Sequence, residues 1–344
     1  MLIAVSAMAQ TFTVNLPDSI CPTGNAVTWE KRITNYCEGP AYEAATGYVY
    51  FTEQAGGANW PIWRIRPATA DTGIRWVTTR QNNGLEFDPQ GRLVAAQDGR
   101  IARYTPAGVL DSALVSTGQN GVTFGQANDL SIGSNGAIYF TQNMTQVFYL
   151  SPTRQLSIAG TGFSGANGIE WLEELNSVYV NETGGSRVRR FPVQANGSLG
   201  TFANFITVPG PDGGTVDAHG NRYVASYTTG EVRVFNAIGD SLGFIRLRFP
   251  SGTYDRTAGA QGNADNAVFG GPNNTILYMT GDGGLYSIQL RIPARLRPGT
   301  PIRNVRLIPV QKSGSRFLDL LGRKWDDFLR HGSLYLSRDR ATSL

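Results

Sequence analysis

EGPAYEAATGYVYFTE, residues 38–53, is the stretch from which the fold can be worked out. It starts with a polar residue and a Gly-Pro pair, continues as an alternating apolar segment, turns at Gly47 and ends in a second alternating segment. Alternation with a period of two residues on both sides of a glycine-containing turn is typical of antiparallel strands. The stretch therefore predicts two strands, the first of which begins near Glu38.

Five later stretches repeat this pattern. They are NGLEFDPQGRLVAAQDG (83–99), NDLSIGSNGAIYFTQ (128–142), NGIEWLEELNSVYVNET (167–183), DGGTVDAHGNRYVASYT (212–228) and NAVFGGPNNTILYMTGD (266–282). Successive starts are separated by 45, 45, 39, 45 and 54 residues. A period near 45 residues, with about four strands per repeat, is typical of the blades of a β-propeller. We therefore predict an all-β fold, a six-bladed β-propeller with a short C-terminal extension.

The repeats also suggest the domain boundaries. We expect the propeller to span residues 11–290, followed by a Pro- and Arg-rich linker or closing strand at 291–310 and a tail at 311–344. A closed ring needs its last blade completed by a distant segment. The candidates are TFTVNL (11–16), which we favour, and NVRLIPV (304–310).

The tail carries most of the positive charge. Residues 291–344 contain twelve Lys or Arg and four Asp, whereas the whole chain has a net charge of +4. The repeats are therefore acidic overall, and we expect no nucleic-acid partner. DLLGR (319–323) and GSLYLSR (332–338) resemble the end of the C-terminal sorting domains of bacterial type IX secretion. The alternative for this tail is an amphipathic helix packed on the propeller.

The N-terminal residues MLIAVSAMAQ (1–10) form an apolar stretch that contains the A-x-A cleavage pattern Ala7-Met8-Ala9. We expect a truncated export signal and a periplasmic, extracellular or cell-surface protein, the alternative being a buried N-terminal strand. Cys21 and Cys37 are the only cysteines, and an oxidising compartment would let them pair; two free buried thiols are the alternative. No apolar run reaches the ~18 residues of a membrane span.

The first residue of every repeat has an oxygen in its side chain. These six heads are Glu38, Asn83, Asn128, Asn167, Asp212 and Asn266. Because the innermost strand of each blade lines the central channel, equivalent residues should meet around one axis. Oxygen ligands with one or two carboxylates suit Ca²⁺, with another divalent cation such as Mg²⁺ or Zn²⁺ as the alternative. Taken singly, the Asn-Gly and Asp-Gly pairs could also be ordinary hairpin turns.

The repeats resemble the family of senescence marker protein (regucalcin), gluconolactonase and luciferin-regenerating enzyme over about residues 36–290. The resemblance rests on EGP-x-Y (38–42), Asn-Asp-Leu (128–130) with GAIYFT (136–141), Asn-Gly-Ile (167–169), Pro-Asp-Gly (211–213) and AVFGG (267–271). It implies a six-bladed propeller with one divalent cation, usually Ca²⁺, in the channel. By this resemblance Glu38, Asn167 and Asp212 are metal ligands, and Asn128 contacts the metal or the substrate.

One position departs from the family pattern. Sugar-lactone members of the regucalcin type have an Arg two residues before the third head, where this chain has Gln126. A neutral amide cannot replace the charged, bidentate guanidinium group. This departure argues against a sugar lactone as the substrate. We expect Gln126, Asn83 and Asn128 to contact whatever substrate is bound.

The sequence thus predicts a calcium-dependent hydrolase of a small lactone or ester. The cation would polarise the carbonyl group, and Asp212, by resemblance, would act as general base or as nucleophile. One alternative is a propeller that binds a ligand without turnover and holds a structural cation; the other is a phosphotriester hydrolase. We expect a small-molecule substrate, a monomer, and a solvent-facing turn residue at His219.

Overall fold

The computed structural model describes residues 12–142, 144–247 and 263–296 of the 344-residue chain. All of these residues belong to one compact unit, Met1–Pro301. Within them the chain forms strands and only two short 3-10 helices, η1 (Gln119–Gly121) and η2 (Glu173–Leu175). The predicted all-β class is confirmed. No helix in this part of the chain is long and apolar enough to cross a membrane.

The strands pair antiparallel with their sequence neighbours. One sheet contains β3 (Tyr36–Glu43), β4 (Tyr48–Gln54), β5 (Ile62–Ile65) and β6 (Ile74–Val77), and the next contains β7 (Asn82–Phe87), β8 (Leu93–Gln97), β9 (Arg100–Tyr104) and β10 (Leu110–Ser116). The third contains β11 (Ala127–Ile132), β12 (Ile138–Gln142), β13 (Met144–Leu150), β14 (Leu156–Leu172), β15 (Ser177–Glu182), β16 (Arg187–Pro192) and β17 (Ala203–Thr207). Two further sheets are built on β18 (Pro211–Val216), β19 (Arg222–Ser226), β20 (Glu231–Phe235) and β21 (Ser241–Arg246), and on β22 (Ala264–Gly270), β23 (Ile276–Gly281) and β24 (Gly284–Gln289).

The long strand β14 explains why the third sheet has seven strands. Its first part, from Leu156 to Thr161, pairs with β13, and its last part, from Ala166 to Leu172, pairs with β15. The same strand is therefore the outer strand of the third repeat and the innermost strand of the fourth.

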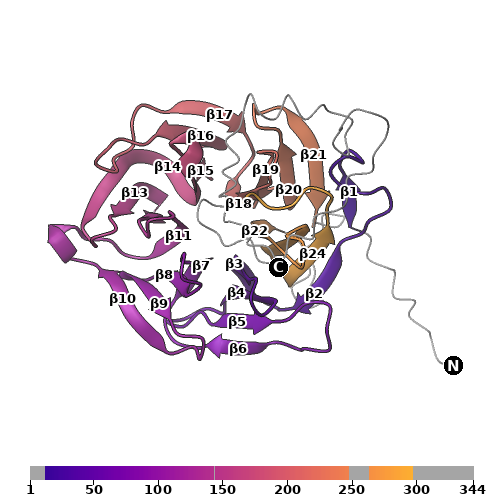
Figure 1. Ribbon diagram of the computed structural model, residues 1–344, viewed down its shortest axis with the longest axis horizontal. Coiled ribbons are helices and arrows are strands. Elements are labelled where there is room, and N and C mark those ends of the chain that lie inside the picture. The colour runs from indigo at the N-terminus through magenta and orange to yellow at the C-terminus, as the bar shows by residue number, and fades with distance from the viewer. Residues whose placement is uncertain (1–11, 143, 248–262, 297–344) are drawn as a thin grey trace, which may run out of the picture. The chain divides into compact units, whose positions relative to one another are not determined.

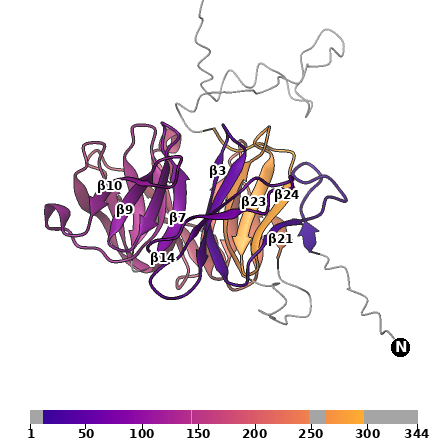
Figure 2. The same cartoon turned by 90° about the horizontal axis from the view of Figure 1, so that it is seen from below.

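The innermost strands form a closed ring (Figure 1). β3 contacts β7, β7 contacts β11, and β11 contacts β14; β14 contacts β18, β18 contacts β22, and β22 contacts β3 again. Seen from the side, β3, β23 and β24 run from one face of the ring towards the other (Figure 2). Aromatic and aliphatic side chains fill the space between neighbouring sheets, as where Phe124 packs against Phe140 with ring centroids 5.1 Å apart.

The ring is closed by a segment that the sequence analysis did not identify. β2 (Thr28–Arg32) pairs with β24 and completes the sheet of β22, β23 and β24. β1 (Thr13–Asn15), in the segment 11–16 that we expected to do this, pairs instead with β21. The side chain of Trp29 explains why β2, and not β1, pairs with β24. Its ring stacks on Tyr286 with centroids 5.4 Å apart, and its Nε1 donates a hydrogen bond to Gly283 O at 2.9 Å.

Several predictions concern residues outside the described ranges. These are the export signal at 1–10, the alternative closing strand at 304–310 and the tail at 311–344. Cys21 and Cys37, in contrast, are both described, and both are buried free thiols in separate hydrophobic clusters. The pairing that we considered is therefore wrong, and the alternative of two free thiols is correct.

Candidate functional site

Each innermost strand is irregular near its first residues. In β3, two residues lie opposite one residue of β4 between the pairs Glu38–Thr52 and Ala41–Tyr50. Bulges of the same kind occur at residues 83–84, 128–129, 167–168 and 212–213, and β22 has one extra residue at 265. A bulge interrupts the ladder and changes the direction of nearby side chains. All six heads thus lie within or beside a bulge.

Neighbouring heads approach one another closely around the ring. A Cβ atom on Gly39 would lie 2.3 Å from Asn83 O, and one on Gly168 would lie 2.3 Å from Asp212 O. A Cβ atom on Gly213 would lie 2.0 Å from Asn266 Cγ. At Gly39 and Gly168 the neighbouring atom is backbone, so only glycine fits there, whereas at Gly213 the glycine makes room for the Asn266 side chain. The second residue of these repeats is therefore glycine for a packing reason, and it lets the heads lie side by side.

The carboxyl groups of Glu38 and Asp212 meet at one hydroxyl group. Both side chains are buried. Tyr36 Oη lies 3.1 Å from Glu38 Oε1 and 3.2 Å from Asp212 Oδ2. The backbone N–H of Gly39 also donates a hydrogen bond to Glu38 Oε2, at 3.2 Å. Two heads that are far apart in the sequence are thus neighbours in the ring.

The electrostatic environment of these carboxyl groups disfavours their charged forms. Burial raises the pKa of Asp212 from its ordinary 3.8 to about 8, against the lowering effect of the Tyr36 hydrogen bond. Burial also raises the pKa of Glu38 well above its usual range, and the nearby carboxyl groups of Asp212 and Asp129 raise it further. For Asp129, burial raises the pKa to about 6. Several carboxyl groups therefore share a region that lacks a counter-charge among the described residues.

Asp265, next to the predicted head Asn266, belongs to the same group. It is fully buried, and its pKa is raised well above the usual range by burial and then by Glu38 and Asp212. Neither of its carboxyl oxygens makes a hydrogen bond of normal geometry with a described residue, although the Tyr36 hydroxyl is near enough to lower the pKa of Asp265; Asp212 Oδ1 and Asn83 Oδ1 likewise lack such a hydrogen bond. Buried acceptors normally have partners, so this concentration of unpartnered oxygens needs a donor or a cation.

The remaining predicted residues occupy different positions. Asn167 is buried, and its Nδ2 donates to Thr183 Oγ1 at 3.2 Å; that hydroxyl donates in turn to Pro211 O at 2.7 Å, which ties the last part of β14 to the start of β18. Asn128 is half-buried at the start of β11. Gln126 is half-buried and lies just before β11, where it forms an isolated bridge with Asp98.

Tyr36, Asp129 and Asp265 were missed by the sequence analysis. Tyr36 lies two residues before Glu38, and alternate residues of a strand share a face, so its position was a usable signal. Asp129 and Asp265 stand directly beside heads in the sequence. They were overlooked because regular alternation would point them away from the heads, whereas the bulges bring both close enough to influence the other carboxyl groups.

His, Cys, Asp and Glu do not form a metal site by themselves. In residues 12–142, 144–247 and 263–296, no group of three or more of these side chains is arranged so that it could hold a metal ion. A cation among the heads would therefore need amide oxygens from Asn side chains as well as carboxylates. That mixture of hard oxygen donors is characteristic of Ca²⁺ sites.

Two cavities of the described residues lie elsewhere. One, of about 260 Å³, is lined by Tyr42, Phe87 and Trp171, among others, and the second, of about 290 Å³, is lined by His219 and Arg222. None of the six heads lines either cavity. His219 is exposed in the turn after β18, as expected.

Known proteins of similar sequence are named as lactonases. The lactonase drp35 of Staphylococcus epidermidis is 27% identical over 209 residues, which cover 54% of this chain and 63% of that protein. A gluconolactonase of Zymomonas mobilis is 26% identical over 194 residues, 48% of this chain and 54% of that protein. The chain thus spans a little over half to three fifths of the length of these relatives.

Solved structures share the fold. A gluconolactonase of Xanthomonas campestris superposes with a TM-score of 0.67 and 24% identity, covering 83% of this chain and 96% of that one. The calcium-binding protein regucalcin of Agrobacterium tumefaciens gives a TM-score of 0.63 and 18% identity, covering 80% and 96%.

The family model of the SMP-30/gluconolactonase/LRE-like region matches residues 36–282, which is most of the ring described above. The resemblance seen in the sequence is confirmed, and the chain belongs to the SMP-30/gluconolactonase/LRE-like family.

Proposed function

We propose that the protein is a six-bladed β-propeller that hydrolyses a small lactone or ester with the help of a divalent cation bound among its heads. The blade count follows if the two halves of β14 are assigned to different blades, since each half pairs with its own neighbouring strands. The membership of the family and the names of the relatives favour lactone hydrolysis.

The observation that carries this proposal is the meeting of Glu38 and Asp212 at Tyr36 Oη, beside buried oxygens without partners. The residues fit a cation, because carboxyl groups with raised pKa values and unpartnered amide and carboxyl oxygens are what a hard cation would neutralise. We assign Glu38, Asn167 and Asp212 as its ligands, with Asn128 as a further candidate. Ca²⁺ suits this donor set best, and Mg²⁺ or Zn²⁺ is the alternative.

The chemistry supplied by such a cation is polarisation of the substrate carbonyl. Asp212 would accept a proton from the attacking water or attack the carbonyl carbon itself. Tyr36 would hold the Asp212 carboxyl in place through its hydroxyl group. The amide groups of Asn83, Asn128 and Gln126 would orient the substrate by donating hydrogen bonds to its oxygens.

Gln126 bears on the choice of substrate. An amide forms hydrogen bonds but carries no charge. It should therefore bind a polyhydroxy lactone less tightly than an Arg would. We therefore propose a less polar lactone or an aryl ester as the substrate class. Export, which rests on residues 1–10, and a monomeric state also remain proposals.

A hydrolysis assay of the purified full chain tests this function. The panel would contain gluconolactone, an aliphatic δ-lactone, an aryl acetate and an aryl phosphotriester, each assayed after chelation and after the return of Ca²⁺. We expect Ca²⁺-dependent turnover of a lactone or ester that falls by about 10²–10⁴-fold in Asp212→Asn. Asp240→Asn, which changes an exposed carboxyl between β20 and β21, is the control and should leave turnover unchanged.

Each other outcome contradicts part of the proposal. Ca²⁺ binding without turnover on any substrate would favour the ligand-binding propeller with a structural cation. Turnover confined to the phosphotriester would favour the phosphotriester hydrolase. Turnover that is insensitive to chelation would exclude the role of the cation.

A further inference from the structure

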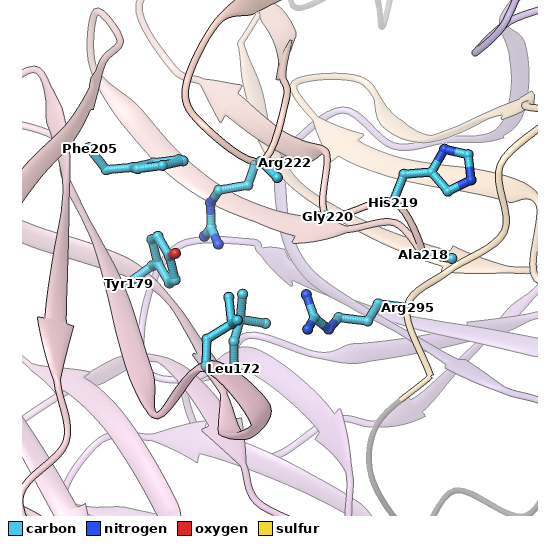
Figure 3. A pocket seen from close by; sticks show the side chains of 10 residues that line it. Leu172, Tyr179, Phe205, Ala218, His219, Gly220, Arg222 and Arg295 are labelled. Carbon is cyan, nitrogen blue, oxygen red and sulfur yellow. The ribbon is translucent and has the colours of Figure 1, made fainter. Parts of the chain in front are cut away.

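A second site lies at the opposite end of β18 from Asp212. The cavity of about 290 Å³ is bordered by the turn that follows β18 and by side chains of β14, β15 and β17. Leu172, Tyr179 and Phe205 form apolar parts of the wall, and Arg222 and Arg295 contribute guanidinium groups, while His219 lies at the border of the cavity with its ring turned away from them (Figure 3). At about 3.3 Å per residue, the turn lies roughly 15–20 Å along the strand from Asp212. The cavity is therefore separate from the heads.

Arg222 is the unusual residue of this cavity. Its side chain comes from the first residue of β19 and is 6% exposed. Its Nε and Nη1 are buried and have no hydrogen-bond partner among the described residues. Its guanidinium carbon lies 4.0 Å from the centre of the Tyr179 ring, so the cation rests on an aromatic face. A buried guanidinium with unpaired N–H groups is unfavourable unless an acceptor binds it.

The charges around Arg222 limit what that acceptor can be. Glu170 lies near enough to interact with Arg222 electrostatically, yet it does not satisfy Nε and Nη1. Arg295 forms an ion pair with Glu174. Two arginines are thus opposed by the carboxylate of Glu174 and, where it is ionised, by that of Glu170, which leaves at most one excess positive charge, too little for a dianion such as phosphate. A singly charged ligand suits this balance.

The shape of the cavity and the residues that line it favour the same kind of ligand, one with a single negative charge. In Figure 3 the guanidinium groups of Arg222 and Arg295 both point into the space beside Leu172 and Tyr179. A planar carboxylate matches the fork of an arginine, and an apolar body would contact Leu172 and Phe205. The volume of about 290 Å³ lies just below the about 300–1,000 Å³ typical of ligand pockets, so the ligand must be small.

We propose that this cavity binds a small organic monocarboxylate, whose carboxylate group accepts hydrogen bonds from Arg222 and whose apolar part lies against Leu172, Tyr179 and Phe205. This site goes beyond the proposed hydrolysis and does not depend on it.

Calorimetric titration of the full chain with benzoate tests the proposal, with benzamide as the neutral analogue and inorganic phosphate as the dianion. We expect one benzoate per chain, with binding of benzamide and phosphate at least tenfold weaker. Arg222→Lys should weaken benzoate binding at least tenfold because it removes the fork. Phe205→Ala should weaken it severalfold, whereas Arg75→Gln, on the edge strand β6, should not change it.

Asp212→Asn separates this site from the heads, because it should lower hydrolysis by about 10²–10⁴-fold and leave benzoate binding intact. Since Arg222→Lys could also disturb folding, circular dichroism and thermal unfolding accompany every variant, and Phe205→Ala and Arg295→Gln test the cavity wall independently. Equal affinity for benzoate and benzamide, tighter binding of phosphate, unchanged binding in the folded cavity variants, or no saturable binding of benzoate to the unmodified chain would each overturn the proposal.

Discussion

The carboxyl groups of Glu38 and Asp212, on β3 and β18, both lie within 3.2 Å of one atom, Tyr36 Oη. A phenol has a single hydrogen to donate, so it can donate to only one of the two carboxyl groups at a time. The other contact becomes a hydrogen bond only if the carboxyl group itself holds a proton. The raised pKa values of Glu38 and Asp212 agree with such sharing.

Tyr36→Phe tests the importance of this hydroxyl group. We expect the free energy of unfolding to fall by about 1–3 kcal/mol, because a buried carboxyl group loses its donor. Hydrolysis of the best lactone should also fall, since Asp212 is then less firmly oriented. Denaturant unfolding and initial rates measure the two effects. The matched control is Tyr227→Phe, whose ring lies 6.0 Å from that of Tyr36 and is partly exposed; equal effects of both variants would contradict the assignment.

Asp265→Asn tests whether the third buried carboxyl group belongs to the cation site. We expect this variant to be more stable than the parent chain in chelator, because one of several mutually repelling carboxyl groups is neutralised. In the presence of Ca²⁺ the parent chain should instead be more stable than the variant. A cation at 100 times its Kd stabilises the parent by about 2.7 kcal/mol, and the variant should gain less. Thermal unfolding with and without Ca²⁺ checks both signs, and identical shifts in parent and variant would exclude Asp265 from the site.

Glu170 should make stability depend on pH. Burial raises its pKa from 4.5 to about 7, although Arg222 opposes the rise. The folded state therefore holds this proton more tightly than the unfolded state does, so the contribution is fully present below about pH 4.5 and is lost as the pH rises to about 7. We expect a loss on the order of 1 kcal/mol after solvent screening. Glu170→Gln should flatten this part of the stability profile measured by urea unfolding, whereas Asp240→Asn should keep it.

Gly213→Ala should disrupt the contact between the fifth and sixth heads. The added Cβ would lie 2.0 Å from Asn266 Cγ, so the side chain of this head must leave its position or one of the two strands must shift. We expect a loss of about 1–3 kcal/mol in the free energy of unfolding, together with weaker Ca²⁺ binding. At Gly160 the nearest atoms to an added Cβ would be 3.3 Å away or more, which makes Gly160→Ala the control. A Gly213→Ala variant with parental stability and Ca²⁺ affinity would show that the heads are not packed as described.

Trp29→Ala tests the closure of the ring by β2. The variant loses the stacking on Tyr286 and the hydrogen bond to Gly283 O. Because Trp29 is only half-buried, we expect a loss of about 2–4 kcal/mol, at or below the range for fully buried aromatic residues. Chemical denaturation provides the measurement, and Ile238→Ala, which removes a side chain that is 79% exposed, should have almost no effect.

The repeat pattern located the innermost strands well. Asn83, Asn128 and Asp212 each lie one residue after the first residue of β7, β11 and β18, and Glu38 lies two residues into β3. The pattern succeeded because alternation and glycine turns are local properties of the chain. It also identified heads that turn out to lie side by side, which the close backbone approaches at Gly39 and Gly168 and the close approach of the Asn266 side chain to Gly213 show.

The features that escaped the sequence analysis depend on contacts between distant segments. The closing strand TWEKR (28–32) has no clear apolar alternation, and its place depends on its pairing with β24 and on the contacts of Trp29 with Tyr286 and Gly283. Asp265 lies near the carboxyl groups of Glu38 and Asp212 because a bulge changes the register of β22. The cavity beside Arg222 depends on turns and strand ends of several sheets, and no repeat of a motif marks it.

The strand β14 has a consequence for how this protein could have lengthened or shortened during evolution. At most borders between repeats, a whole blade could be duplicated or removed by cutting a connecting loop. Between the third and fourth repeats there is no such loop, because Leu156–Leu172 is one strand that serves both, and the interval between heads is only 39 residues there. Gain or loss of a unit at this border would sever hydrogen-bonded ladders on both sides, so these two repeats should be inherited together.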